Sequence, residues 1–202
     1  MVVDQQQIDS NQKKILERKL IFKRYGYDQD VSRNFILEKC LPIYNPVLEV
    51  GTGKGHMTVL LAKYADVITI DISKDEQKAA QLNARFFEIL HKIHFVACDA
   101  GKLPYKDLYF GLVVSVNAFH HFEEPFAVLS EMIRVCKSKL VISDFNQEGF
   151  NIVRKVHKQE GRTHKEQCGD FSIVGAYLKE HGFSVKSYDG HHQKIYVANR
   201  IK

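Results

Sequence analysis

The chain has 202 residues, of which 45% are hydrophobic and 26% charged, and its formal net charge is +5. This length and composition fit one globular domain with a sizeable core, and four scattered cysteines argue against a disulfide framework. No apolar run approaches the ~18 residues that span a bilayer, and the start "MVVDQQQ" lacks the parts of a signal peptide, so we expect a cytoplasmic protein without a membrane segment.

The positive charge gathers at the two ends of the chain, in "KKILERKLIFKR" and in "NRIK". In the first of these segments, Ile15, Leu16, Lys19, Leu20 and Lys23 recur at three-and-four spacing, which predicts an amphipathic helix with a basic side. That side is either solvated or attracts an anionic partner such as a nucleic acid, and both interpretations stay open here.

Two helical segments precede Pro46, and after it apolar runs alternate with amphipathic stretches. Five runs have the length of buried strands: "PVLEVG", "DVITID", "IHFVACD", "GLVVSVN" and "KLVISDF". The stretches at 76–90 and 124–135 predict helices between them. Strands that are buried on both faces and joined by helical crossovers indicate a parallel, doubly wound α/β sheet.

The end of the chain departs from this alternation. Two more helices are predicted at about 149–161 and 170–181, the second capped by Asp170 and ended by Gly182. The final "GFSVKSYDGHHQKIYVANR" predicts a hairpin of two edge strands around Asp189 and Gly190. Since no linker or repeat interrupts the chain, we expect a single domain over residues 1–202.

The first strand runs directly into "GTGKG", before a helical pattern that begins at about His56. In a parallel sheet, ligands bind beyond the carboxyl ends of the strands, and glycines let the backbone approach them closely. A dinucleotide-binding turn needs a glycine where His56 stands, and a P-loop needs a Lys and Ser/Thr pair that does not follow here. The turn alone therefore predicts a ligand site without identifying the ligand.

Acidic residues close the next two strands. Asp71 comes ~20 residues after the first glycine, where a carboxylate could accept both hydroxyls of a ribose. Asp99, in "FVACDAGKLPY", could accept a hydrogen bond from an exocyclic amine. Either acid alone could be a helix cap, but both occur together with the glycine turn and with "GLVVSVNAFHHFEEP".

The segments "LEVGTGKG", "ITIDIS", "VACDAGKLPY", "VVSVNAFHHFEEPFAVLSEMIRV" and "KLVISDF" follow one another in the order typical of one family. Over roughly residues 47–145 the chain resembles class I S-adenosylmethionine-dependent methyltransferases, of the small-molecule type that includes ubiquinone/menaquinone C-methyltransferases. The resemblance implies a Rossmann-like, three-layer α/β/α fold whose seven-stranded sheet has the order 3-2-1-4-5-7-6 and an antiparallel last strand.

The resemblance also implies a role for each part of the predicted site. It assigns the methionine end of S-adenosylmethionine to Glu49 and the turn residues Gly51, Thr52, Gly53 and Gly55. It assigns the ribose to Asp71, the adenine to Ile72, Asp99 and Ala100, and the rim near the sulfonium to Asn117. The product of the reaction would be S-adenosylhomocysteine.

Two departures from the family pattern bear on this resemblance. The "Pro-Gly-Gly" turn common before the fifth strand is replaced by "RVCKSKLVISD", which affects the geometry of the neighbouring loop. The fourth strand ends in "SVNAFHHF", without the Asn/Asp-Pro-Pro-Tyr/Phe motif by which related enzymes hold a planar amine, so nucleobase amino groups are disfavoured as acceptors.

Methyl transfer from a sulfonium requires an in-line nucleophile and the exclusion of water, with no covalent intermediate. A base assists when the acceptor is a hydroxyl or an acidic carbon, and His120 and His121 follow the fourth strand where such a base would stand. The alternative is that one of them is a packed loop residue and the other a solvated one.

Residues 1–45 are expected to form an N-terminal helical cap or lid, since in this fold the segments outside the core tend to cover the cofactor. Tyr25 and Tyr27 would wall the substrate pocket there, or would only pack a helix onto the core. The segment after the fifth strand contains possible metal ligands, but their spacing favours a solvated helix face and loop over a metal site: His157, Glu160, His164 and Cys168.

The sequence thus predicts a methyltransferase that acts on a small molecule. An RNA methyltransferase and a non-catalytic S-adenosylmethionine-binding protein stay open as alternatives, the first because of the basic chain ends. The acceptor atom and the oligomeric state, monomer or dimer, are not determined by these patterns.

Overall fold

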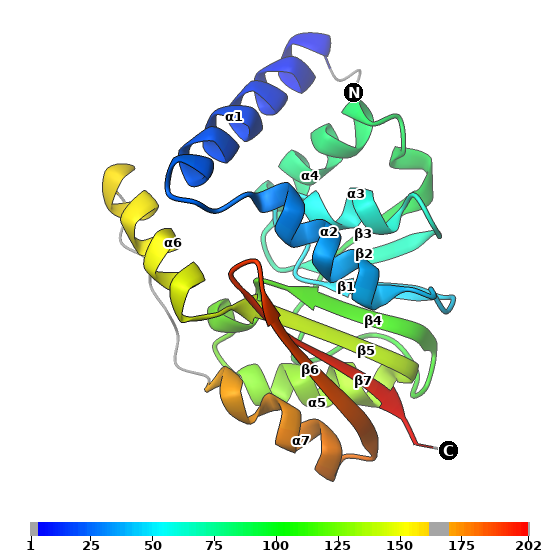
Figure 1. Cartoon of the computed structure of the whole chain (residues 1–202). Helices are drawn as coiled ribbons and strands as arrows, with labels where there is room; N and C mark the ends of the chain where they lie inside the picture. The colour runs from blue at the N-terminus through cyan, green and yellow to red at the C-terminus, as the bar shows by residue number, and fades with distance from the viewer. Residues whose placement is uncertain (1–3, 162–169, 202) are drawn as a thin grey trace.

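The computed structural model describes residues 4–161 and 170–201, and its seven strands form one sheet in the order β3-β2-β1-β4-β5-β7-β6 (Figure 1). The strands are β1 (Val47–Val50), β2 (Val67–Asp71), β3 (Ile93–Ala97), β4 (Phe110–Val116), β5 (Cys136–Phe145), β6 (Phe183–Gly190) and β7 (Gln193–Arg200). β7 pairs antiparallel with both β5 and β6, whereas the pairs among β1 to β5 are parallel. The predicted fold class and strand order are confirmed.

Helices cover both faces of the sheet, which makes three layers. α5 (Pro125–Val135) and α7 (Val174–Glu180) pack on one face, while α2 (Gln29–Cys40), α3 (His56–Leu61) and α4 (Lys74–Phe86) lie on the other. α1 (Gln5–Arg24) and α6 (Gln147–Gln159) lie beyond this sandwich. Within the described residues no helix is both long and apolar enough to cross a membrane.

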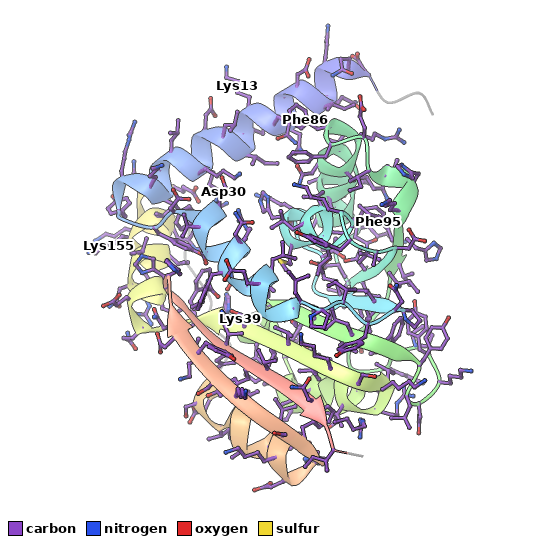
Figure 2. The ribbon with its side chains drawn as sticks, turned by 45° about the vertical axis from the view of Figure 1, so that its right-hand side comes forward. Lys13, Asp30, Lys39, Phe86, Phe95 and Lys155 are labelled. Atoms are coloured by element: carbon purple, nitrogen blue, oxygen red, sulfur yellow. The ribbon has the colours of Figure 1, made fainter. Side chains whose placement is uncertain are left out.

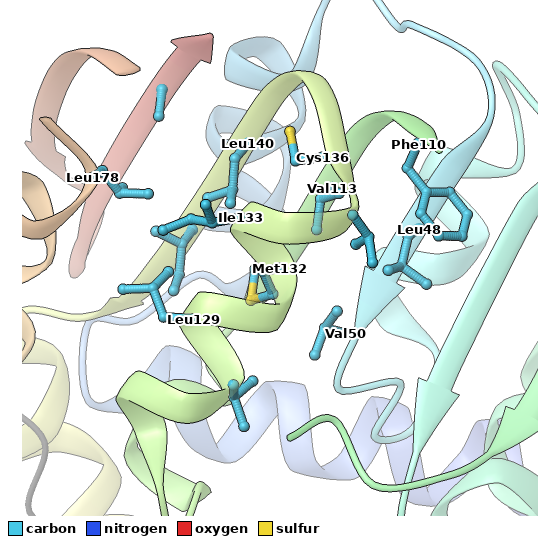
Figure 3. Packing of buried hydrophobic residues seen from close by; sticks show 14 of the residues in the cluster. Leu48, Val50, Phe110, Val113, Leu129, Met132, Ile133, Cys136, Leu140 and Leu178 are labelled. Atoms are coloured by element: carbon cyan, nitrogen blue, oxygen red, sulfur yellow. The ribbon is translucent and has the colours of Figure 1, made fainter. Parts of the chain in front are cut away.

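The central strand β4 explains why the apolar runs are continuous rather than alternating. Leu112, Val113 and Val114 are all 0% exposed, because successive side chains enter the two different cores on either side of the sheet. Figure 3 shows the core that Val113 joins, in which Leu48 and Val50 of β1 face Met132 of α5.

The N-terminal helices are fixed to the sandwich by polar contacts as well as apolar ones. α1 runs from α4 to α6, and its Gln12 donates a buried hydrogen bond of 2.8 Å to Asn83 Oδ1 of α4. Asp28 caps α2, and Asp30 lies at the start of that helix beside α1 (Figure 2). At the other end of α2, the buried Lys139 of β5 donates to Cys40 O at 2.9 Å and Leu41 O at 2.7 Å.

Two predicted boundaries differ from the structure for a local reason. α4 ends at Phe86 rather than near residue 90, because the chain takes a positive φ of 56° at Glu88 before a short 3-10 turn. β5 begins at Cys136, directly after α5, because this buried residue already pairs with Phe110 of β4.

The predicted hairpin is present, but its turn and one of its strands were placed wrongly. Asp189 and Gly190 continue the ladder, pairing with Lys194 and Gln193, and the turn falls on the next two residues. These are His191 and His192, with φ values of 51° and 65°, as a two-residue turn with two left-handed positions requires. β7 is not an edge strand, because β5 pairs with its other side.

Gly111 of β4 provides a test of how the loop before β1 seats on the sheet. A Cβ at Gly111 would lie 2.5 Å from Tyr44 O and 2.6 Å from Asn45 O, so Gly111→Ala must displace backbone. We expect a loss of roughly 1–3 kcal/mol in the free energy of unfolding, measured by urea titration. Gly190→Ala is the control, because its Cβ would meet only Phe35 ring atoms at 3.6 Å. Equal stability of the two variants would contradict this packing.

Candidate functional site

The carboxyl ends of β1 to β4 open into one cavity of about 830 Å³. Many of the residues predicted from the sequence lie in its wall, namely Glu49, Gly51, Thr52, Gly53, Asp71, Ile72, Asp99, Ala100, Asn117 and His121. This volume is that of a small-molecule site, and the position beyond the strand ends is where parallel sheets bind their ligands.

The turn after β1 needs glycine for two different reasons. At Gly51, with φ of 90°, an added Cβ would lie 2.6 Å from Ala118 Cβ, so the turn packs closely against the segment after β4. Gly55, with φ of 73°, does not line the cavity; its missing side chain lets Ala80 of α4 approach to 2.8 Å of the Cβ position. Gly51 therefore shapes the cavity wall, whereas Gly55 seats α3 against α4.

Asp71 ties this turn to the end of β2. Its Oδ2 accepts a hydrogen bond of 2.8 Å from Gly53 N, and its Oδ1 accepts one of 2.9 Å from Ser73 N. Each carboxylate oxygen has two lone pairs, so both can accept a further hydrogen bond from a ligand. Beside it, Ile72 is 78% exposed in the cavity wall, which offers an apolar surface to a planar group.

Asp99 and Asn117 present acceptors at two other points of the cavity. Asp99 Oδ1 accepts a hydrogen bond of 2.8 Å from Gly101 N, and the residue is exposed. Asn117 has a φ of 54°, and its buried Oδ1 has no hydrogen-bond partner among the described residues. A buried acceptor without a partner costs free energy, so a ligand donor or cation at that oxygen would be stabilising.

Glu49 is a buried carboxylate at the base of the cavity. The residue is 2% exposed, and its Oε2 accepts hydrogen bonds from the hydroxyls of Thr58 and Thr69. Thr69 Oγ1 lies 2.7 Å from Thr52 Oγ1, which links the turn to this group. Burial raises the pKa of Glu49 to about 7, so the carboxylate is poised to ionise when a cationic group binds next to it.

Three basic residues in the cavity wall were not predicted as site residues: Arg33, Lys54 and His56. Arg33 of α2 lines the cavity together with His56, the residue that stands in place of the last glycine of the dinucleotide pattern. The sequence holds one signal for Arg33, since it lies four residues before Leu37 and seven before Cys40, on the apolar side of its helix.

The two histidines after β4 occupy different environments. His121 is exposed and lines the cavity, whereas His120 is 5% exposed and lies behind it, with the two ring centroids 3.9 Å apart. His120 Nδ1 lies 2.7 Å from Asp144 Oδ1, and His120 N donates to Asp144 Oδ2 at 3.0 Å. Asp144 ends the buried part of β5 at 1% exposure and had not been considered, although it stands in the quoted "KLVISDF".

The two tyrosines proposed for the lid do not line the cavity as the described residues define it. Tyr27 is 2% exposed, and its hydroxyl lies 3.3 Å from Ser32 Oγ and accepts a hydrogen bond of 3.1 Å from Gln193 Nε2. Tyr25 is 39% exposed and donates to Gln159 Oε1 of α6. Both join α1 and α2 to the rest of the domain, and a role over a substrate stays a prediction.

In the part of the chain that the structure describes, no three His, Cys, Asp or Glu side chains gather as a metal site. His157 Nε2 lies 3.0 Å from Arg18 Nη2 of α1, and Glu160 pairs with the same arginine at 3.5 Å. His164 and Cys168 lie outside the described residues.

Comparison with known proteins shows what the domain is similar to. Residues 48–142 match the model of a family described as a methyltransferase domain. The chain is 28% identical over 103 residues to 27-O-demethylrifamycin SV methyltransferase of Amycolatopsis mediterranei (strain S699), covering 49% of this chain and 38% of that protein. It is 26% identical over 117 residues to the ubiquinone/menaquinone biosynthesis C-methyltransferase of Vibrio vulnificus (strain YJ016), covering 55% and 45%.

The fold has close counterparts among solved structures. Magnesium protoporphyrin IX methyltransferase from Synechocystis PCC 6803, with bound S-adenosylhomocysteine, superposes with a TM-score of 0.62 at 21% identity, over 85% of this chain and 81% of that one. At this identity the likeness shows the fold alone. The chain spans less than half the length of the two curated relatives named above.

The buried Glu49 gives a prediction that does not depend on any ligand. Its pKa is about 7 in the folded chain against 4.5 for the ordinary group, so the fold favours the protonated form. Stability is therefore lost as the pH rises through this interval, by about 3 kcal/mol at most. Glutamine cannot ionise, so the Glu49→Gln variant should escape this loss. We expect the stability of the variant relative to the native chain to rise by about that much from pH 5 to pH 8.

Chemical denaturation at both pH values measures this difference, with Glu17→Gln, at an exposed glutamate of α1, as the control for the substitution itself. A Glu49→Gln variant whose stability follows the native chain at both pH values would mean that Glu49 ionises normally in the fold.

Proposed function

From a chain that carries a methyltransferase domain in residues 48–142, we propose an enzyme that transfers the methyl group of S-adenosylmethionine to a small-molecule acceptor and releases S-adenosylhomocysteine. The names of the relatives support a small-molecule acceptor. One relative is a methyltransferase of 27-O-demethylrifamycin SV, and the other is a C-methyltransferase of ubiquinone/menaquinone biosynthesis.

One observation carries the proposal: three neighbouring strands end in groups that suit the three parts of this cofactor, in one cavity. The turn after β1, with Glu49 beneath it, would receive the amino-acid part. Asp71 at the end of β2 would accept hydrogen bonds from the ribose hydroxyls. Asp99 and Ala100 after β3 would contact the adenine, with Ile72 against its face.

The chain's contribution to such a reaction is positioning and the exclusion of water. When bound, S-adenosylmethionine supplies an electrophilic methyl group on a sulfonium. The turn at Gly51 packs closely against the segment at Asn117 and Ala118. Together they would fix the end of the cavity that receives the methyl group. A rigid wall there favours one line of approach for the acceptor, which is where a displacement reaction gains its rate.

The histidines after β4 suit removal of a proton from the acceptor, with His121 in the cavity wall and the pair of His120 and Asp144 directly behind it. With Nδ1 donating to Asp144, the lone pair of the His120 imidazole is on Nε2, behind the cavity wall and beside the ring of His121. His121, whose ring centroid lies 3.9 Å from that of His120, lines the cavity and is therefore the histidine that a bound acceptor would meet first. We propose that the acceptor is a hydroxyl or an acidic carbon, because such groups need this assistance.

No observation on the described residues favours RNA as the substrate. Three basic side chains of α1 are already paired with carboxylates: Arg18 with Glu160, Lys19 with Asp30 and Lys23 with Asp28. A non-catalytic, cofactor-binding role is not favoured either. The cytoplasmic location, the oligomeric state and the role of residues 1–45 as a lid stay predictions.

Calorimetry tests the cofactor directly. We expect micromolar binding of S-adenosylhomocysteine and no comparable binding of NAD, because His56 replaces the glycine that a dinucleotide needs. Asp71→Asn should weaken S-adenosylhomocysteine at least tenfold, since it removes charge from two ribose hydrogen bonds worth roughly 1.5–3 kcal/mol each. The exposed Asp66→Asn serves as the control. Tight NAD binding without a response to S-adenosylhomocysteine would refute the assignment.

The histidine pair is tested by activity against a panel of hydroxyl-bearing small molecules with labelled S-adenosylmethionine. We expect His120→Gln and Asp144→Asn to lower turnover by roughly 10²–10⁴ and to change the pH–rate profile, while S-adenosylhomocysteine affinity stays within twofold. The exposed His91→Gln should leave turnover unchanged. Native turnover in both test variants would assign the pair a structural role only.

A further inference from the structure

We infer that Gln12 of α1 and Asn83 of α4 form a positioning relay. The relay holds the glycine turn after β1 from outside the cavity, so that the docking of α1 and the affinity of the cavity for its ligand are coupled. This inference rests on the proposed function, because S-adenosylmethionine or S-adenosylhomocysteine would be that ligand. It gives a role to α1, a helix that lies outside the matched residues 48–142.

The relay begins with a polar residue on an apolar helix face. Ile8, Gln12 and Ile15 recur at four-and-three spacing on the buried side of α1, and Gln12 is 8% exposed. An apolar side chain would pack α1 there at lower cost, because burial of an amide is unfavourable unless its hydrogen bonds compensate for the lost water. A glutamine at this position therefore indicates that its hydrogen bond does more than attach the helix.

Gln12 fixes the orientation of one buried amide group in α4. Gln12 Nε2 donates to Asn83 Oδ1 at 2.8 Å, and Asn83 is 2% exposed. With its oxygen taken by Gln12, the amide of Asn83 directs its Nδ2 toward the glycine turn. If the amide were rotated by half a turn, its oxygen would face backbone carbonyl oxygens and repel them.

Asn83 contacts the turn through two of its carbonyl groups. Asn83 Nδ2 donates to Gly55 O at 3.3 Å and to Lys54 O at 3.4 Å. One helical turn earlier, Ala80 Cβ lies 2.8 Å from the position that a Cβ of Gly55 would take. Neither Gln12 nor Asn83 lines the cavity as the described residues define it, whereas Lys54 does, so the relay reaches the turn from outside.

The turn is therefore held from two sides. Gly53 and Asp71 both line the cavity and are joined there by the hydrogen bond of 2.8 Å, while Asn83 holds the next two residues from behind. The bonds from Asn83 exceed the length of about 2.9–3.0 Å that is usual for N–H···O contacts, so they can shorten. A ligand that seats on the turn favours the conformer in which these bonds are short, and in that conformer α1 is bound most firmly.

Such a coupling acts in both directions. If the docking of α1 raises the affinity for a ligand, the ligand stabilises the docked helix by the same free energy. The chain offers a comparison, because Asn11 of α1 also donates to α4, at 3.3 Å to Ala79 O, but does not reach the turn. Figure 2 shows this half of α1 alongside the end of α4 at Phe86.

Calorimetry with S-adenosylhomocysteine compares the two contacts. Gln12→Leu keeps a side chain of similar size and removes the donor to Asn83, so we expect affinity to fall roughly three- to tenfold. Asn11→Leu, the matched control, should stay within about twofold. Urea titration should show no greater loss of stability in Gln12→Leu than in Asn11→Leu, since the relay positions the turn rather than supporting the fold.

A double variant tests whether Gln12 acts through Asn83. Asn83→Leu removes the contact with the turn, so we expect it to weaken S-adenosylhomocysteine at least as much as Gln12→Leu does. Adding Gln12→Leu to Asn83→Leu should then change the affinity no further.

Amide exchange measures the coupling from the other side. We expect S-adenosylhomocysteine to slow exchange over residues 8–16 in the native chain and in Asn11→Leu, but not in Gln12→Leu. Without ligand, the amides of residues 53–55 should exchange faster in Gln12→Leu than in the native chain, because the turn has lost its support.

The outcomes separate this inference from the proposed function. Failure of the native chain to bind S-adenosylhomocysteine removes the proposed function, and the coupling to the cofactor with it. Native binding with unchanged affinity in Gln12→Leu overturns the inference alone. An equal loss in Gln12→Leu and Asn11→Leu also overturns it, since any loosening of α1 would then have the same effect. Unchanged exchange of residues 53–55 in ligand-free Gln12→Leu overturns the relay whether or not the cofactor binds.

Discussion

The hydrogen bond from Gly53 N to Asp71 Oδ2 is the contact on which the geometry of the cavity depends. It joins the turn after β1 to the end of β2, so that two neighbouring strands present their ends at a fixed separation. The ladder between β1 and β2 sets the strands, and Gly51 N and Thr52 N still donate to Ile70 O at 2.9 and 3.0 Å, but Gly53 lies beyond these backbone bonds. The Asp71 carboxylate, which also accepts from Ser73 N, extends the backbone contacts to Gly53 and keeps further lone pairs for a ligand.

The cavity keeps polar groups that the fold does not need. Burial raises the pKa of Glu49 to about 7, Asn117 Oδ1 has no partner among the described residues, and the Arg33 guanidinium is only partly compensated. Each of these costs stability in the free chain, and each would be offset by a ligand with the complementary group. Polar groups that lower the stability of the free chain and gather in one cavity are typical of a binding site, where stability and function compete.

How much the sequence predicted depends on the range of the interactions involved. The strands and the acids that close them follow from local patterns, and the parallel sheet then brings Asp71 and Asp99 to one edge. Asp144 was missed because its partner His120 is 24 residues away in the chain and becomes its neighbour only when β5 pairs with β4. Arg33 was missed because the local sequence places it on the apolar side of its helix but does not show that this side faces the cavity.

The most direct test is a crystal structure of the chain with S-adenosylhomocysteine. We expect the adenine beside Asp99, both ribose hydroxyls on Asp71, and the amino-acid group at the turn after β1, above Glu49. Density for the ligand outside this cavity, or with its adenine at that turn and its amino-acid group at Asp99, would contradict the account.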